Sequence, residues 1–189
     1  MEAWEAKLAV YGTEYMSLGA ADIQRRVSAE LVTVQQQLDN PRLWSVAARL
    51  MTLYAKTFPG SDGAKAVHWY RMAAQAADAF EDLDTRVWVR GRAAIALGYE
   101  GAALPVADVL ADQAMALSDR PSLGLLDAVF GKAHAAALRG DHTTARRPPR
   151  TRPESHRRRG EVRRGHHGLR ARPLRPGRPD IPLPPPRPA

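Results

Sequence analysis

Cysteine is absent from the chain, which excludes disulfide bonds and metal sites built on thiolates. No apolar run approaches the roughly 18 residues that a membrane-spanning helix needs. The first residues carry Glu2 and Glu5, where a secretory signal has a basic segment followed by an apolar one. We therefore expect a cytoplasmic protein that does not bind membranes.

Acidic residues are scarce in only one part of the chain. The 189 residues contain 28 Lys and Arg against 20 Asp and Glu, for a net charge of +8. Residues 1–145 hold 14 basic and 17 acidic residues, whereas residues 146–189 hold 14 arginines and 3 acidic residues. A basic chain is typical of proteins that bind nucleic acids. Here that signature belongs to the last quarter, and the rest is mildly acidic.

Apolar residues recur at intervals of three and four along the first 145 residues, which is the spacing of one face of a helix. Ile23, Val27 and Leu31 begin one such stripe, and no segment alternates with the period of two that a strand shows. Turn residues around Pro59 and Pro121 separate the stripes. The sequence predicts helices over residues 2–16, 20–38, 42–57, 62–80, 84–99, 103–118 and 122–138.

The predicted helices repeat in pairs. Connections of two to six residues make neighbouring helices antiparallel. The segment 75–82 is echoed at 113–119, 38 residues later, and 96–101 is echoed at 137–142, 41 residues later. Small residues at Gly91, Ala94 and Gly98 share one side of helix 84–99 and permit close packing. We predict an all-α array of antiparallel helical hairpins of the tetratricopeptide type.

The repeat stops at Arg146. A helix is due to open near Asp141, but Pro148 and Pro149 lack the backbone N–H that a helix needs. Residues 146–189 contain 14 Arg, 11 Pro, 4 Gly and 3 His and no aromatic residue, too little apolar surface for a core. We predict a helical domain over 1–146 and a disordered Arg/Pro-rich tail over 147–189.

Three explanations of this tail are open. All four lysines precede it, and Arg, Pro and Gly have GC-rich codons, so the tail has the composition of a GC-rich gene read out of frame. We hypothesise a frameshift near codon 147, which makes the chain a truncated product. Alternatively, the arginines bind nucleic acid phosphates without sequence preference. The closing Pro-Pro-Pro-Arg-Pro segment also suits an SH3-type groove.

Residues 88–118, WVRGRAAIALGYEGAALPVADVLADQAMALS, together with 15–38 and 73–94, resemble the C-terminal region of actinobacterial helix-turn-helix transcriptional regulators of the XRE type. The similarity covers roughly residues 4–147. In that family a DNA-binding domain precedes a tetratricopeptide-like array that senses a ligand or partner. The resemblance implies a regulatory module that lacks this DNA-binding domain, so sequence-specific DNA binding does not carry over.

Tetratricopeptide arrays bind partners on a concave face formed by the first helix of each pair. Arg86 and Arg90 share one face of helix 84–99, and together with Arg92 they are candidates for binding a carboxylate or phosphate. The alternative is a solvated helix face on which these arginines pair with Asp82 or Asp84.

Three tryptophans in different helices are the aromatic candidates. Trp69 and Trp88, with Trp44, are placed to form an aromatic floor for a ligand or peptide. The alternative is that they fill the interfaces between helices, as large aromatic residues commonly do.

No pattern of catalytic residues is visible, so we expect no enzyme activity, no cofactor and no metal. His68 and His134 are not spaced as a metal-binding pair. The expected function is a non-catalytic interaction module that binds a protein, a peptide or a small effector. The alternatives are nucleic acid binding through the tail and an all-α enzyme. Without a capping helix, helix 122–138 should expose Leu126 and Phe130, and self-association should follow.

Overall fold

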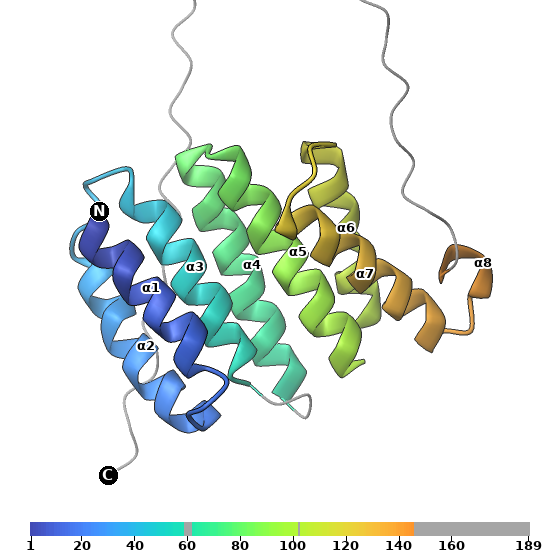
Figure 1. Ribbon diagram of the computed structural model, residues 1–189, viewed down its shortest axis with the longest axis horizontal. Helices are drawn as coiled ribbons and strands as arrows, with labels where there is room; N and C mark the ends of the chain where they lie inside the picture. Colours follow the sequence, from blue (N-terminus) through green and yellow to red (C-terminus); the bar gives the residue numbers. More distant parts are fainter. Residues whose placement is uncertain (59–61, 102, 146–189) are drawn as a thin grey trace, which may run out of the picture.

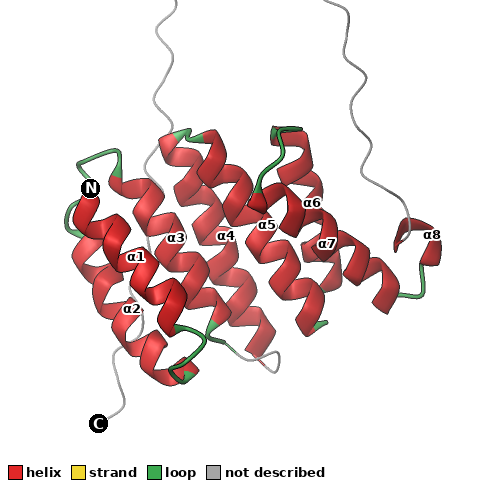
Figure 2. Cartoon of the chain, viewed as in Figure 1, coloured by secondary structure: helices red, strands yellow, loops and turns green. Residues whose placement is uncertain are grey.

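The computed structural model describes residues 1–58, 62–101 and 103–145, and within these ranges all regular structure is helical (Figure 2). The helices are α1 (Glu2–Glu14), α2 (Ala20–Gln35), α3 (Leu43–Lys56), α4 (Gly63–Phe80), α5 (Leu83–Glu100), α6 (Leu104–Leu117), α7 (Leu123–Leu138) and α8 (His142–Ala145). The predicted all-α fold is confirmed, and both ends of each predicted helix lie within three residues of the observed ones. The predicted disordered tail over 147–189 lies outside the described residues.

One element differs from the sequence analysis. The prolines at 148 and 149 were expected to prevent a helix after Asp141, yet His142–Ala145 form the single turn α8. The Ala145 N–H donates to the Asp141 carbonyl at 3.1 Å, which closes that turn. The prolines follow Ala145, the last residue of this turn, and lie outside the described residues.

The helices form two layers (Figure 1). Helices α1, α3, α5 and α7 contact one another in that order and form what we call the inner layer. Helices α2, α4 and α6 pack against the inner helices as the second members of the hairpins. This arrangement is the predicted array of antiparallel helical hairpins, in which each pair buries its apolar face against the next.

Helices α5 and α7 run parallel and touch through glycine. A Cβ added to Gly91 would lie 1.9 Å from the carbonyl oxygen of Gly124, and one added to Gly98 would lie 2.8 Å from that of Gly131. Both contacts join residues that are 33 positions apart, close to the tetratricopeptide repeat length. The echoes at 38 and 41 residues therefore do not mark the register of this contact.

Capping residues fix where α5 and α7 begin. The Asp82 carboxylate accepts a hydrogen bond from the Thr85 N–H at 3.1 Å. The Ser122 hydroxyl accepts one from the Leu125 N–H at 3.2 Å. Helix α5 ends at Gly101, whose φ of 70° is the left-handed conformation that glycine adopts readily. These caps hold the helix ends that carry the inner layer.

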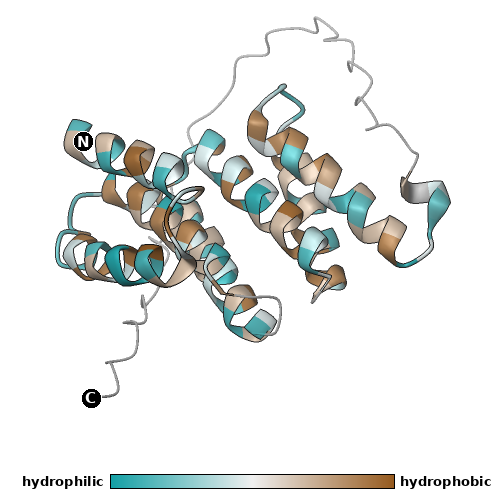
Figure 3. Ribbon diagram, turned by 60° about the horizontal axis from the view of Figure 1, so that its bottom comes forward, coloured by the Kyte–Doolittle hydropathy of each residue, from teal (hydrophilic) through white to brown (hydrophobic). Residues whose placement is uncertain are grey.

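Hydrophobic and hydrophilic residues alternate along the helices (Figure 3), and the hydrophobic ones make up most of the buried residues. Helix α3 is the most enclosed, with 11 of its 14 residues buried, so it forms the centre of the core. Across the α3–α4 contact, the rings of Tyr54 and Trp69 meet edge to face with centroids 4.7 Å apart. This contact is the favoured geometry for two aromatic rings.

The outward face of α7 is apolar and exposed. Leu123, Leu126, Phe130 and Leu138 are 59%, 51%, 56% and 54% exposed, so the predicted exposure of Leu126 and Phe130 is confirmed. Nothing among the described residues covers this face. Within the same ranges, no helix has both the length and the apolar character to cross a membrane.

Candidate ligand-binding groove

A cavity of about 1060 Å³ opens along the inner layer, and we call it the inner groove. Its walls come from α1, α3 and α5, with the segment that follows α1 and the segment that leads into α7 closing its ends. Helix α4 of the outer layer contributes Tyr70. The groove therefore lies where tetratricopeptide arrays present their concave binding face.

Helix α3 presents a single stripe to this groove. Its three residues that are not buried are Arg49, Leu53 and Lys56, and all three line the cavity. They are spaced by four and three positions, which places them on one face of the helix. Every other side chain of α3 is buried in the core, so the charges of this helix face the groove.

Helix α5 supplies the opposite wall by the same rule. Asp84, Trp88, Arg92, Ile95 and Tyr99 line the cavity at spacings of three and four. Gly91, Ala94 and Gly98 of α5 lie against α7 instead. One face of α5 therefore packs against α7, and another face lines the groove.

Lys56 is a cation without an anionic partner. Among the described residues no carboxylate forms an ion pair with its ammonium group, which lies 4.0 Å from the centre of the Tyr15 ring. Burial lowers the pKa of Lys56, and the positive charge of Arg92 lowers it further, while Asp127 acts in the opposite direction. The ammonium is thus partly desolvated and only partly compensated.

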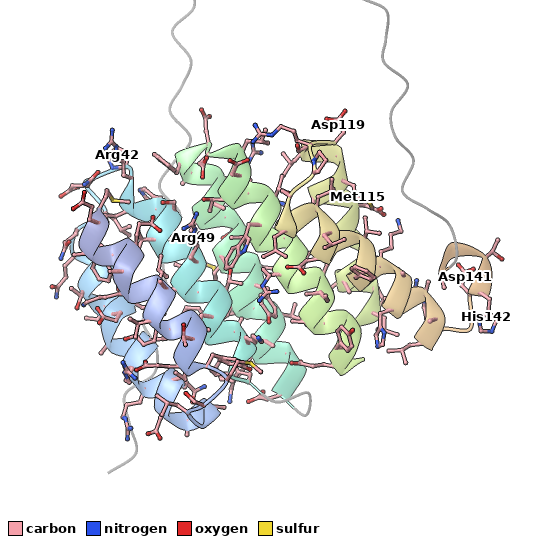
Figure 4. All side chains as sticks on the ribbon, viewed as in Figure 1. Arg42, Arg49, Met115, Asp119, Asp141 and His142 are labelled. Atoms are coloured by element: carbon pink, nitrogen blue, oxygen red, sulfur yellow. The ribbon has the colours of Figure 1, made fainter. Side chains whose placement is uncertain are left out.

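Two of the three arginines that line the groove, Arg92 and Arg49, have partners on neighbouring helices. Arg92 Nη1 donates to Asp127 Oδ2 on α7 at 3.1 Å, and this carboxylate is nearly buried. Arg49 Nη1 lies 3.0 Å from Glu5 Oε2 on α1, and its guanidinium stands 6.0 Å from the centre of the Trp88 ring. Figure 4 shows Arg49 over α3, next to α1. The anionic partners come from flanking helices, so both guanidinium groups are held in place along the groove.

Tyr70 forms part of the floor. Its side chain is 1% exposed, and its hydroxyl has no hydrogen-bond partner among the described residues. Burial raises the pKa of Tyr70 strongly; the neighbouring Glu100 and Tyr15 raise it further, and Arg92 lowers it. All three neighbours line the cavity, so the hydroxyl end of the ring faces the groove.

Tyr15 and Glu100 stand at the same end. The Tyr15 hydroxyl donates to the Lys56 carbonyl oxygen at 3.2 Å, and burial followed by the charge of Glu100 raises its pKa. Burial also raises the pKa of Glu100. Two tyrosines, one carboxyl group and the unpaired Lys56 thus meet at the carboxyl ends of α3 and α5.

The structure separates the five candidate residues of the sequence analysis. Trp88 and Arg92 line the groove, whereas Arg86, Arg90 and Trp69 do not. Trp69 is 5% exposed and packs on Tyr54, and Trp44 is buried as well, so the three tryptophans do not form one floor.

Arg86 and Arg90 bind α4 instead. Arg86 Nε and Arg90 Nη2 each lie 2.7 Å from a carboxylate oxygen of Asp78, and Arg90 Nε donates to Gln113 of α6 at 3.1 Å. The expected intrahelical partners were wrong: Asp82 caps α5, and the pairing reaches across to another helix. These arginines clamp α4, α5 and α6 together.

The sequence analysis missed Lys56, Arg49 and Tyr70. A signal existed for the first two, because they are the charged residues of an otherwise apolar helix and stand seven positions apart. Tyr70 carried no such signal, since it lies in an apolar stripe and only the fold exposes its hydroxyl to a cavity.

Neither His68 nor His134 lines the groove. His68 is exposed, and His134 stacks on Tyr99 with ring centroids 4.3 Å apart. No group of three or more histidine and acidic residues suited to a metal ion occurs in the described part of the chain.

Comparisons with known proteins give no relative: no family model, no curated protein and no solved structure matches the chain. The resemblance to XRE-type regulators therefore stays an expectation that rests on the sequence. The function is therefore inferred from the inner groove.

Proposed function

We propose that the chain is a non-catalytic regulatory module that binds a peptide, a protein segment or a small effector in the inner groove. The observation that carries this proposal is the convergence of Arg49, Lys56, Trp88 and Arg92 on one cavity of about 1060 Å³. Ligand pockets commonly combine an apolar or aromatic lining with a few polar groups that fix orientation, at volumes up to about 1000 Å³. The groove has both.

The energetics of α3 favour the same function. A helix that buries 11 of 14 residues gains stability from apolar side chains, and a cation on it costs free energy to desolvate. The Lys56 ammonium packs against the Tyr15 ring but forms no ion pair with a carboxylate of the described residues. An anionic ligand supplies the opposite charge that this packing lacks.

The assignment to a transcriptional regulator is supported by the resemblance of residues 15–38 and 73–118 alone. It is tested on the coding DNA. An in-frame helix-turn-helix domain upstream of residue 1 supports it, and an unrelated open reading frame there contradicts it.

The binding function is tested by blocking the groove. Ala96 lines the cavity, whereas Ala79 is exposed on α4 outside it, so Ala96→Trp and Ala79→Trp form a matched pair. The wild-type chain is screened by thermal shift against short synthetic peptides and small organic effectors. We expect at least one compound to raise the melting temperature of the wild type and of Ala79→Trp but not of Ala96→Trp. Equal responses of the two variants contradict the proposal.

A second candidate is nucleic acid binding by residues 146–189, which the excess of 14 arginines over 3 acidic residues favours. Such binding weakens steeply as salt rises, because each neutralised phosphate releases counterions. We expect it to vanish in a chain that ends at residue 145 and to be unaffected by Ala96→Trp. Binding that survives the truncation contradicts this candidate.

A further inference from the structure

We propose that the end of the inner groove formed by Lys56, Arg92 and Tyr70 is a site for a carboxylate group, carried by a ligand with an apolar or aromatic body. This inference rests on the proposed function and specifies the chemistry of the ligand. Its elements are three side chains from three different helices, α3, α4 and α5.

Lys56 provides a positive charge that is only partly compensated. Its ammonium is partly buried, lies against the Tyr15 ring and has no ion pair among the described residues. Glu100 does not compensate it, because the charges that act on Lys56 are those of Arg92 and Asp127. A desolvated cation is costly unless an anion approaches it. An anionic group placed above Lys56 removes that cost.

Arg92 provides directed donors beside Lys56. One of its N–H groups is held by Asp127, at 3.1 Å, and an arginine has five such donors in a planar fork. The side chain is 37% exposed and lines the cavity. Because Asp127 fixes the plane of the guanidinium, the donors that remain are oriented in advance, which favours recognition of a planar carboxylate.

Tyr70 provides a hydroxyl donor at the floor of the groove. The ring is 1% exposed, and the hydroxyl faces the groove without a hydrogen-bond partner among the described residues. Because Tyr70 lines the cavity, its hydroxyl is open to a group bound in the groove. The charge of Arg92 acts on this hydroxyl, so both donors serve the same end of the groove.

The charges at this end favour a monoanion. Lys56 and Arg92 are cationic, and Asp127 pairs with Arg92. The Glu100 carboxyl group lies at the same end and acts on Tyr15 and Tyr70, so it opposes a second negative charge on the ligand, as a phosphate would carry. Beyond the cations the groove is lined by Leu53, Trp88 and other apolar side chains, which suit an apolar body.

The test is a calorimetric titration of the full chain with 4-phenylbutyrate and with its neutral amide, 4-phenylbutyramide. We expect the acid to bind about tenfold to a hundredfold more tightly than the amide, because a hydrogen bond to a charged group contributes that much. Equal affinities of acid and amide, or no binding of the acid at about 1 mM, overturn the carboxylate site.

Variants assign the effect to the residues. We expect Lys56→Met to weaken binding of the acid about tenfold or more and to leave binding of the amide unchanged. Tyr70→Phe should weaken the acid less, because a neutral donor contributes less than a charged one. Lys65→Met is the control, since Lys65 is exposed on α4 outside the groove. Unchanged affinity of Lys56→Met for the acid overturns the site.

The folding of the variants is part of the test. Lys56→Met removes an unpaired, partly buried charge and keeps an apolar side chain of similar length, so we expect its melting temperature not to fall. A structural role for Lys56 predicts the opposite. If Lys56→Met does not fold, the comparison of acid and amide on the wild type and on Tyr70→Phe decides.

Two further experiments are needed. One distinguishes a peptide end from a small acid as the source of the carboxylate, and the other distinguishes the groove function from the carboxylate site. An apolar pentapeptide with a free carboxyl end is compared with its amide; tighter binding than 4-phenylbutyrate assigns the site to a peptide end, and weaker binding to a small acid. Binding of acid and amide alike that Ala96→Trp abolishes leaves the groove function intact and removes only the carboxylate site. Binding of the acid that Ala96→Trp does not affect removes both.

Discussion

Two neighbouring contacts of the inner layer are built in opposite ways. Between α5 and α7 the backbones touch, because Gly91 faces Gly124 and a Cβ there would lie 1.9 Å from the Gly124 carbonyl oxygen. Between α3 and α5 the facing residues are long or aromatic, among them Lys56, Trp88 and Arg92, and a cavity of about 1060 Å³ remains. The first contact is closed to any ligand and the second is open.

The size of the side chains at the crossing decides whether two helices pack closely or leave room for a ligand. Interaxial distance depends on the side chains at the contact. Helix α5 takes part in both contacts with different faces, so one helix supplies the rigid joint and the binding wall. Its position against α7 also fixes Arg92, through Asp127. The packing of α5 against α7 therefore orients Arg92 in the groove.

We expect the largest effect from a substitution at the close contact between α5 and α7. Gly91→Ala forces a methyl group against the backbone of α7, and we expect the free energy of unfolding to fall by about 3 kcal/mol, the upper range for overpacking. Gly12→Ala is the control, because a Cβ at Gly12 meets nothing within 4 Å. It should raise the free energy by about 0.5–1 kcal/mol. Both are measured by urea unfolding, and a Gly91→Ala chain as stable as the wild type contradicts the closed contact.

We expect the second-largest effect on stability from the loss of Asp78, which pairs with Arg86 and Arg90. Asp78→Ala removes the shared partner of Arg86 and Arg90, and Arg90 is 7% exposed. We expect a loss of about 2 kcal/mol, less than for a fully buried pair because Asp78 is partly exposed. Asp22→Ala removes an exposed pair with Arg25 and should change stability by less than about 0.5 kcal/mol. Equal effects in chemical denaturation argue against the clamp.

Substitutions on the outward face of α7 should change self-association and leave stability nearly unchanged. Leu126→Glu and Phe130→Glu place charges on an exposed apolar surface, so we expect stability changes of no more than about 0.5 kcal/mol. Self-association of the wild-type chain, measured by sedimentation, should weaken in both variants. A wild type that stays monomeric at high concentration contradicts the expectation of self-association.

The smallest effect concerns the rim of the groove. Burial raises the pKa of Glu100, so the folded state binds this proton more tightly than the unfolded state does. Stability is then fully present below the ordinary pKa of a glutamate and falls as the pH rises through the raised value. We expect Glu100→Gln to stabilise the chain slightly at pH 7 and not at pH 4, in thermal unfolding at both values. Equal gains at both pH values contradict a desolvated carboxyl group.

The sequence predicted the helices well because most of them carry an apolar stripe and are bounded by turn residues; α1, which buries only Tyr11, lacks such a stripe. It also predicted the close side of α5, since Gly91, Ala94 and Gly98 share a face; the partner residues Gly124 and Gly131 show the same spacing of seven. The groove was harder to predict. Trp88 and Arg92 were identified as candidates, but Arg86 and Arg90 have the same residue type and neighbouring positions.

What separates these arginines is the helix that each one faces, and that depends on the packing of three hairpins. Asp78 lies eight positions before Arg86, on another helix, and it captures both Arg86 and Arg90. Tyr70 illustrates the same limit, because its stripe predicts burial correctly and cannot indicate that the hydroxyl end meets a cavity. Long-range placement, and not local propensity, decides these cases.

Lys56 is a partly desolvated cation that forms no ion pair with a described carboxylate, and we propose that it receives a carboxylate in the open groove. The chain has four lysines, so their side-chain NMR signals are few, and Lys56→Met assigns the relevant one. The account predicts that Lys56 titrates below its ordinary pKa in the free chain, and that 4-phenylbutyrate raises this pKa while the other three lysines do not respond. A Lys56 signal that titrates normally and ignores the acid contradicts it.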